Sequence, residues 1–103
     1  MTWKLYLDDE RNPTQAGWTV VRSSVMAVVR CVERNELPEL MSLDHDLGEK
    51  DDTMRFLKEL HHIWETMGAD PDKIPKYVVH SENPVGAKNI ISFMESWKKS
   101  VFM

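Results

Sequence analysis

Four short apolar runs stand out along the chain, and three of them stop abruptly at charged or hydrogen-bonding residues. Their length, their β-branched and aromatic content and the turn-forming residues around them favour β-strands over helices. The four runs cover residues 3–7, 18–22, 40–43 and 76–79. The abrupt change to polar residues follows the first, third and fourth runs, at Asp8, Asp44 and His80. The pattern therefore predicts strands that carry reactive side chains at their carboxyl ends.

Apolar residues recur at helical spacing in three other segments. Ser23 and Ser24 can cap the first helix, the second can begin at any of residues 51–53, and Asn83 followed by Pro84 is typical of a cap and a first helical position. The residues expected to be buried are Val25, Val28, Val29 and Val32 in the first helix, Met54, Leu57, Leu60 or His61, Trp64 and Met67 in the second, and Ala87, Ile90, Ile91, Met94 and Trp97 in the third.

The order of these elements is strand, strand, helix, strand, helix, strand, helix, which is typical of a parallel α/β sheet. Residues 8–17, between the first two strands, contain no convincing helix, although parallel strands are usually joined by roughly a dozen or more residues. In parallel sheets, ligands bind beyond the carboxyl ends of the strands. The polar residues that follow the first, third and fourth strands are expected to meet there, so this end of the sheet is the candidate site.

A chain of 103 residues has room for one domain, spanning residues 1–103, and for one hydrophobic core. The formal net charge of −4 argues against a broad basic surface for nucleic acid, although it is compatible with a small local site. Cys31 is the sole cysteine, which excludes an internal disulfide and fits a reducing compartment. Without a signal peptide or a long apolar span, we expect a cytoplasmic protein that does not associate with membranes.

The strand-end segments resemble those of the receiver domains of two-component signalling. The acidic run of residues 8–10 is similar to the acidic pair of receivers, Asp44 stands where receivers carry the phospho-acceptor aspartate, and Ser81 is similar to their serine or threonine. The resemblance is closer to a divergent group, the cyclic-phosphate processing receiver-like domains, and rests on residues 7–13, 43–48 and 80–87.

This resemblance implies a small receiver-like (flavodoxin-like) three-layer fold. The elements read from the sequence itself predict that its mainly parallel sheet has four strands, with a reduced first helix and no fifth strand. It also implies a role in resolving terminal cyclic phosphates in RNA repair. The chain departs from ordinary receivers because it has no lysine beyond a fifth strand to bind a phosphoryl group. Two histidines, His45 and His80, stand at the strand ends instead.

His45 and His80 are the candidate catalytic acid and base. Hydrolysis of a cyclic phosphodiester needs one group to activate water and one to protonate the departing ribose oxygen, and histidine can do either near neutral pH. Successive residues of a strand point to opposite faces, so His45 reaches the same site as Asp44 only if the chain turns at once. The alternative is that one or both histidines bond the loop backbone and have a structural role.

Asp8, Asp9 and Asp44 are the candidate metal ligands. Several carboxylates in one pocket repel each other and any phosphate, unless some are protonated or a divalent cation lies among them. An all-oxygen ligand set suits Mg²⁺, Mn²⁺ or Ca²⁺ rather than zinc, and we expect Mg²⁺ or Mn²⁺ here. Glu10 and Asp46 are further site candidates, and Asp46 can instead cap the loop. The alternative is a solvated acidic rim.

Ser81, Asn83 and Arg11 are the candidate phosphate-binding residues. Free N–H groups at a helix start attract phosphate, a serine hydroxyl adds a donor, and an arginine can make a bidentate contact. The alternatives are a plain helix cap and a surface arginine.

These residues support a cyclic phosphodiesterase, a hydrolase acting on RNA ends with a 2′,3′-cyclic phosphate or on small cyclic nucleotides. Two other functions stay open. One is a signalling receiver phosphorylated on Asp44, and the other is a module that binds a protein partner without catalysis.

Overall fold

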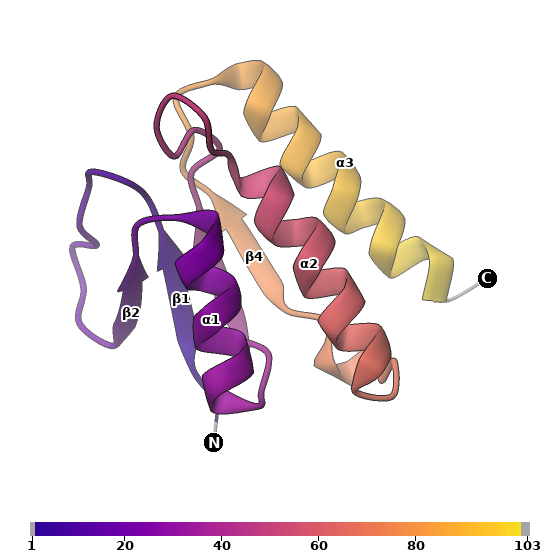
Figure 1. Cartoon of the computed structure of the whole chain (residues 1–103). Helices are drawn as coiled ribbons and strands as arrows, with labels where there is room; N and C mark the ends of the chain where they lie inside the picture. The colour runs from indigo at the N-terminus through magenta and orange to yellow at the C-terminus, as the bar shows by residue number, and fades with distance from the viewer. Residues whose placement is uncertain (1, 102–103) are drawn as a thin grey trace.

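A computed structural model describes residues 2–101 of the chain. Its four strands form one parallel sheet in the order β2-β1-β3-β4 (Figure 1). The strands are β1 (Lys4–Leu7), β2 (Trp18–Val21), β3 (Leu40–Leu43) and β4 (Lys76–Val79). The helices are α1 (Ser24–Arg34), α2 (Thr53–Thr66) and α3 (Pro84–Val101), and a short 3-10 helix spans Pro71–Lys73. The predicted parallel receiver-like α/β fold is confirmed, and the described residues contain no fifth strand.

The three helices begin at residues whose side chains accept a hydrogen bond from the first turn. The side chain of Ser23 accepts from the backbone N–H of Met26 at 3.2 Å, and that of Asp52 accepts from Arg55 at 3.2 Å. Asn83 caps α3 in the same way, because its Oδ1 accepts from the N–H of Gly86 at 3.0 Å. Each cap satisfies an N–H group that the helix itself leaves free.

Side-chain alternation divides the sheet into two faces. We call one the helix face, and its paired rows are Leu5, Thr19, Met41 and Tyr77, and Leu7, Val21, Leu43 and Val79. We call the other the open face, and its rows are Lys4, Trp18, Leu40 and Lys76, and Tyr6, Val20, Ser42 and Val78. The fully buried strand leucines all belong to the helix face, so the hydrophobic core lies on that side.

All three helices pack on the helix face. Figure 1 shows α1 and α2 in front of the sheet with α3 beside α2. Trp97 of α3 packs edge-on against Trp64 of α2, with ring centroids 5.4 Å apart, and Glu95 of α3 accepts a 2.7 Å hydrogen bond from Tyr77 on the helix face.

The prediction of three layers is therefore wrong within residues 2–101, where the domain has two. The β2–α1–β3 and β3–α2–β4 crossovers advance in the same direction across the sheet. Right-handed crossovers that advance in one direction place their helices on one face. The β1–β2 connection, residues 8–17, contains no helix that could cover the other face.

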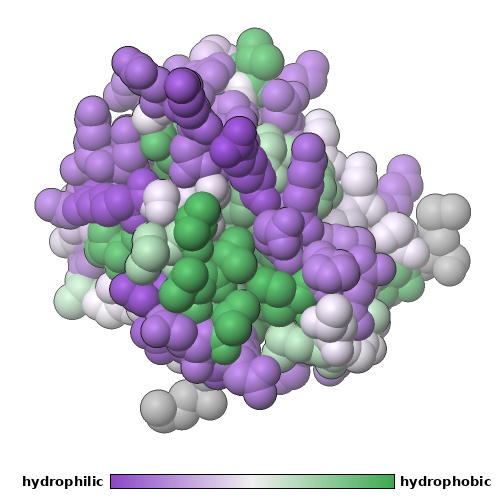
Figure 2. Space-filling view, in the orientation of Figure 1, coloured by the Kyte–Doolittle hydropathy of each residue, from purple (hydrophilic) through white to green (hydrophobic). Residues whose placement is uncertain are grey.

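Two valines of the predicted α1 stripe, Val25 and Val32, face outward, which corrects the expectation that they are buried, whereas Val28 and Val29 are half-buried and Val28 packs against the core. Val25 is 68% exposed and Val32 is 63% exposed, and the buried residues of the helix are Ser24, Ala27 and Cys31. In Figure 2 a hydrophobic patch covers this helix. The reason is a long-range contact: the carboxylate of Asp51 accepts hydrogen bonds from the N–H and the hydroxyl of Ser24, which turns the small residues of α1 toward α2.

The stripes of α2 and α3 are largely confirmed. Leu57, Leu60 and Trp64 are buried, as are Ile90, Met94 and Trp97, and Phe56 joins the core without having been predicted. Met67 and Ile91 are exposed, in contrast to the prediction. Among the described residues, no helix has both the length and the apolar character to cross a membrane.

Candidate functional site

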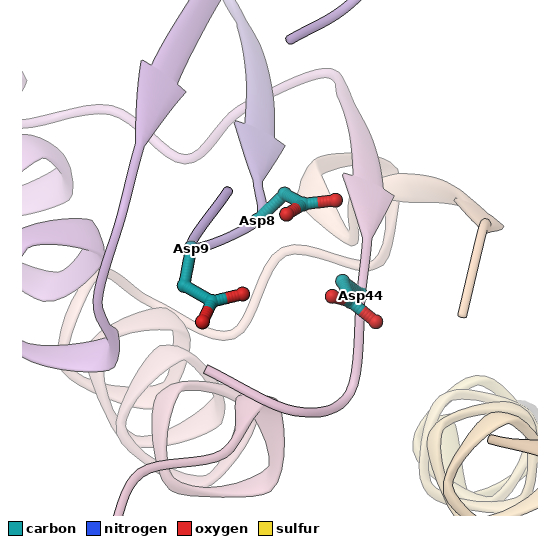
Figure 3. Close-up of side chains that lie close together, drawn as sticks. All are labelled: Asp8, Asp9 and Asp44. Atoms are coloured by element: carbon teal, nitrogen blue, oxygen red, sulfur yellow. The ribbon is translucent and has the colours of Figure 1, made fainter. Parts of the chain in front are cut away.

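Three carboxylates meet at the carboxyl ends of β1 and β3, where the sequence predicted them. Oxygens of Asp8, Asp9 and Asp44 all lie within 4.8 Å of one another. Figure 3 shows their side chains converging from the ends of the two strands. The sheet ladder continues up to this point, since the N–H of Asp44 donates to the carbonyl of Leu7 at 2.9 Å. The parallel pairing of β1 with β3 thus brings the three groups together.

Asp8 is enclosed by four hydrogen-bond donors. Its Oδ1 accepts the backbone N–H groups of Glu10 and Arg11, each at 2.9 Å, and its Oδ2 lies 2.9 Å from Nε of Arg11 and 3.0 Å from Nε2 of His80. Asp8 is only 1% exposed. Burial by itself raises the pKa of this carboxyl, but the two backbone N–H groups, His80 and the charge of Arg11 outweigh burial and hold the pKa below its usual value. Asp8 is therefore ionised.

The positive charge of Arg11 reduces the repulsion among the clustered carboxylates. Besides its contact with Asp8, its Nη2 lies 3.4 Å from Oδ2 of Asp44, and its Nη1 lies 3.7 Å from Oε1 of Glu82. One guanidinium thus spans two buried carboxylates and keeps an exposed side. The prediction that Arg11 lies at the site is consistent with this geometry.

Arg22 holds the loop that carries Asp8 and Arg11, a role that the sequence did not reveal. Its Nη1 donates to the carbonyls of Asp8 at 3.1 Å and Arg11 at 2.6 Å, and its Nη2 donates to the side chain of Asn12. These bonds fix the start of the β1–β2 loop where a helix would otherwise supply the order.

His80 lies across the open face and not beyond the strand end. Its Nδ1 is 2.8 Å from the hydroxyl of Ser42, and its ring stacks on Tyr6 with centroids 4.7 Å apart and an interplanar angle of 11°. Ionised Asp8 only accepts hydrogen bonds, so Nε2 of His80 carries the hydrogen that it donates. Both ring nitrogens are engaged.

Tyr6 and Ser42 contact His80 but were not among the site residues predicted from the sequence. A signal was available in the strand period: each residue lies two positions before an aspartate of the site, Asp8 or Asp44, and so shares its face.

His45 belongs to a second hydrogen-bond cluster. Its Nδ1 lies 2.9 Å from Oδ1 of Asp46, and Oδ2 of Asp46 accepts a 3.2 Å hydrogen bond from Nδ2 of Asn83. The hydrogen bonds from His45 and Asn83 lower the pKa of Asp46. Because Asp46 is a charged acceptor, Nδ1 of His45 carries a hydrogen. In the neutral ring Nε2 is then an acceptor, and it has no hydrogen-bond partner among residues 2–101.

Gly86 makes room for the ring of His45. A Cβ at position 86 would lie 2.4 Å from Cγ of His45, well inside van der Waals contact. The imidazole therefore packs on the first turn of α3, and the absence of a side chain at Gly86 permits this. His45 and His80 have separate partners, so the proposed acid–base pair stays a prediction.

The other predicted residues are placed as follows. The hydroxyl of Ser81 accepts the N–H of Asn83 at 3.1 Å, and Asn83 is engaged at both ends of its amide, by Gly86 and by Asp46. Glu10 contributes its backbone N–H to Asp8, while the residue itself is exposed. Of the three phosphate candidates, Arg11 alone lies against the carboxylate cluster.

The donor set fits a hard divalent cation such as Mg²⁺ or Mn²⁺, because all the candidate ligands are carboxylate oxygens. Asp8 already has four donors, whereas no hydrogen bond occupies the carboxylate of Asp9 within residues 2–101. Asp9 and Asp44 thus have the oxygens that a cation could take.

The structure has a cavity that lies away from the carboxylate cluster. This cavity, of about 550 Å³, lies at the opposite end of the strands and includes Arg34, Pro38 and Trp64 in its wall. None of Asp8, Asp9 and Asp44 lines it.

Comparison with protein families supports the resemblance seen in the sequence. The model of the family described as cyclic-phosphate processing receiver domain matches residues 3–96. Neither the curated proteins nor the solved structures contain a match to the chain. The family match spans all four strands, both clusters of site residues and most of α3. The chain belongs to the cyclic-phosphate processing receiver domain family.

Proposed function

We propose that this domain is a hydrolase that opens cyclic phosphodiesters, acting on RNA ends that carry a 2′,3′-cyclic phosphate with the help of Mg²⁺ or Mn²⁺. The observation that carries the proposal is the cluster of Asp8, Asp9 and Asp44, whose oxygens lie within 4.8 Å of one another, beside the partly exposed guanidinium of Arg11. A cation site next to an arginine is an arrangement suited to a phosphodiester, which carries one negative charge.

Asp9 and Asp44 would hold the cation, which when bound supplies positive charge that polarises a phosphoryl oxygen. Arg11 is the second positive group, and its exposed side can bind the other phosphoryl oxygen. Asp8 keeps Arg11 in position through the 2.9 Å contact with Nε. This division of roles leaves one buried carboxylate to orient the arginine and two to bind the metal.

His45 is the residue best suited to move a proton. Asp46 holds the hydrogen on Nδ1, which makes Nε2 a base, in the way that a carboxylate orients a catalytic imidazole. Nε2 would take a proton from water as the water oxygen bonds to phosphorus, and return it to the ribose oxygen as the ring P–O bond breaks. His80 has both nitrogens engaged, so we assign it to the positioning of Asp8.

The test is incubation of the protein with an oligoribonucleotide that ends in a 2′,3′-cyclic phosphate, with Mg²⁺, Mn²⁺ or EDTA. We expect a monophosphate end that forms only with metal. His45→Ala is expected to lower kcat by roughly 10²-fold or more. Gly86→Ala is expected to lower it as well, because the new Cβ displaces the ring. His62→Ala, an exposed histidine of α2, is the matched control and should retain full activity.

Absence of turnover with any divalent cation, or full activity in both His45→Ala and His80→Ala, would contradict the proposal. A mass increase of one phosphoryl group after treatment with a small phosphodonor, absent in Asp44→Asn, would then favour a phospho-accepting receiver.

A further inference from the structure

The open face of the sheet has a composition unlike the rest of the protein. Its eight strand positions are Lys4, Tyr6, Trp18, Val20, Leu40, Ser42, Lys76 and Val78. Two of these are lysines, both exposed, and none is acidic, although the chain as a whole has a net charge of −4. No helix among residues 2–101 covers this face, so these side chains form a surface that is locally positive on an acidic protein.

Three ring side chains, those of Tyr6, Trp18 and His80, lie on the open face. Tyr6 stacks flat on His80, and Trp18 meets Tyr6 edge-on with centroids 6.0 Å apart. The ammonium of Lys4 lies 5.9 Å from the centre of the Trp18 ring. Each of the three rings is partly exposed. Exposed aromatic rings with lysines beside them are typical of surfaces that bind single-stranded nucleic acid, because bases stack on the rings and the lysines neutralise phosphates.

The open face leads directly to the carboxylate cluster. Tyr6 and Asp8 are two positions apart on β1 and its extension, and Ser42 and Asp44 are related in the same way on β3. His80 joins the two regions, since it stacks on Tyr6 and bonds Asp8. At a rise of about 3.3 Å per residue, the path from Lys4 to Asp8 is roughly 13 Å, which is enough for the last few nucleotides of a strand.

We infer that the open face binds the single-stranded RNA whose 3′ end enters the site, with bases stacked on Trp18 and on the Tyr6–His80 pair and phosphates near Lys4 and Lys76. This inference rests on the proposed function and adds the part of the substrate that is recognised. The charge of the face and its continuity with the site favour RNA over a protein partner. The buried centre of a protein interface is typically depleted of lysine, whereas this face has exposed lysines at Lys4 and Lys76.

The binding test uses fluorescence anisotropy with a labelled oligoribonucleotide that ends in a 3′-phosphate, so that no hydrolysis occurs. The double variant Lys4→Glu/Lys76→Glu should weaken binding at least tenfold and reduce the dependence of binding on salt. Lys58→Glu, an exposed lysine of α2 on the other side of the molecule, is the charge-matched control and should bind within twofold of wild type.

Two further variants separate surface recognition from folding. Trp18→Ala should weaken binding by roughly fivefold to 100-fold, the loss expected for one stacked base. Because Trp18 is partly buried, Val78→Glu provides a second variant at a position that is 51% exposed, and it should also weaken binding without changing the urea midpoint. Unchanged binding by both Val78→Glu and the double lysine variant, or an equal loss in Lys58→Glu, would overturn the inference.

Failure of the inference and failure of the proposed function give different results. If the domain is a hydrolase but this face does not bind RNA, the open-face variants process oligoribonucleotide with an unchanged KM. If the face binds RNA but the domain is not a hydrolase, the oligoribonucleotide binds and its cyclic end persists. Self-association that Val78→Glu abolishes, with no binding of RNA, would assign the face to a second copy of the chain and also overturn the inference.

Discussion

The two faces of the sheet are built from alternate residues of the same four strands, yet they have opposite characters. Leu5, Leu7 and Leu43 on the helix face are completely buried. Tyr6 and Ser42, their immediate neighbours, contact His80 on the open face. Stability thus depends on the helix-face positions, which are odd-numbered in all four strands, and the site depends on the even-numbered open-face positions. We therefore expect substitutions at neighbouring strand residues to have different effects.

The largest difference between the faces is expected from truncation of one strand residue on each. Leu43→Ala should lower the free energy of unfolding by about 2–5 kcal/mol, because it removes a fully buried side chain from the core. Val78→Ala on the open face should lower it by less than about 1 kcal/mol, since the side chain is half exposed. Urea unfolding followed by circular dichroism measures both. Similar losses in the two variants would mean that the open face is covered.

Carboxylates at the ends of the faces should also differ in their effect on stability. Asp8→Asn should cost about 1–3 kcal/mol, because the new amide group offers donors to Arg11 and His80, which need an acceptor. Asp9→Asn is the matched control and should change stability little in EDTA, where it removes one of three crowded negative charges. Urea unfolding of the two variants in EDTA measures both losses of stability. A larger loss in Asp9→Asn than in Asp8→Asn would contradict this prediction.

The pH dependence of stability should show the same contrast. The pKa of Asp8 is lowered in the folded state, so its contribution is complete above the unfolded carboxyl pKa of about 3.9 and is lost as the pH falls through the lower folded value. The wild-type protein should therefore lose stability on acidification below about pH 5 more steeply than Asp8→Asn. Urea midpoints across this range test it, and parallel curves would show that Asp8 is not the group responsible.

The smallest effect is expected on the outer side of α1. Val32→Gln should change the free energy of unfolding by no more than about 0.5 kcal/mol, because the side chain is already in solvent. Ala27→Gln, on the buried side of the same helix, should cost more, since the core has no space for the longer side chain. Equal losses in thermal unfolding would indicate that the valine stripe is covered in solution.

Features that depend on local chemistry could be predicted from the sequence. The third and fourth strands, the caps at Ser23 and Asn83, and the meeting of Asp8, Asp9 and Asp44 are set by residues close in the chain together with the parallel order of the strands. The strand period led us to expect opposite directions for Asp44 and His45 where the strand persists. In the structure Asp44 contacts Arg11 and His45 contacts Asp46.

Features that depend on distant residues could not be predicted. The spacing of apolar residues placed Val25 and Val32 of α1 in the core, but both are exposed. The helix is rotated by the contact of Ser24 with Asp51, and this contact joins two segments that are separate in the sequence. The direction of His80 depends on Tyr6 and Ser42 from two other strands, and each is an ordinary strand residue by itself. The number of layers depends on the direction in which each crossover advances across the sheet. The pattern of apolar and polar residues along the sequence does not specify that direction.

The loop held by Arg22 has a consequence for the order in which the domain folds. Lys4 pairs with Trp18, which is close in the chain, and with Leu40, which is much farther away. Contacts between near segments form with a smaller loss of chain entropy. We therefore expect the pairing of β1 with β2 and the hydrogen bonds of Arg22 to form first. Asp8 and Arg11 are then already in contact when β3 pairs with β1 and brings Asp44 to the site. The repulsion between Asp44 and the other carboxylates would then arise only late in folding. By that stage the guanidinium of Arg11 is already in position to reduce it.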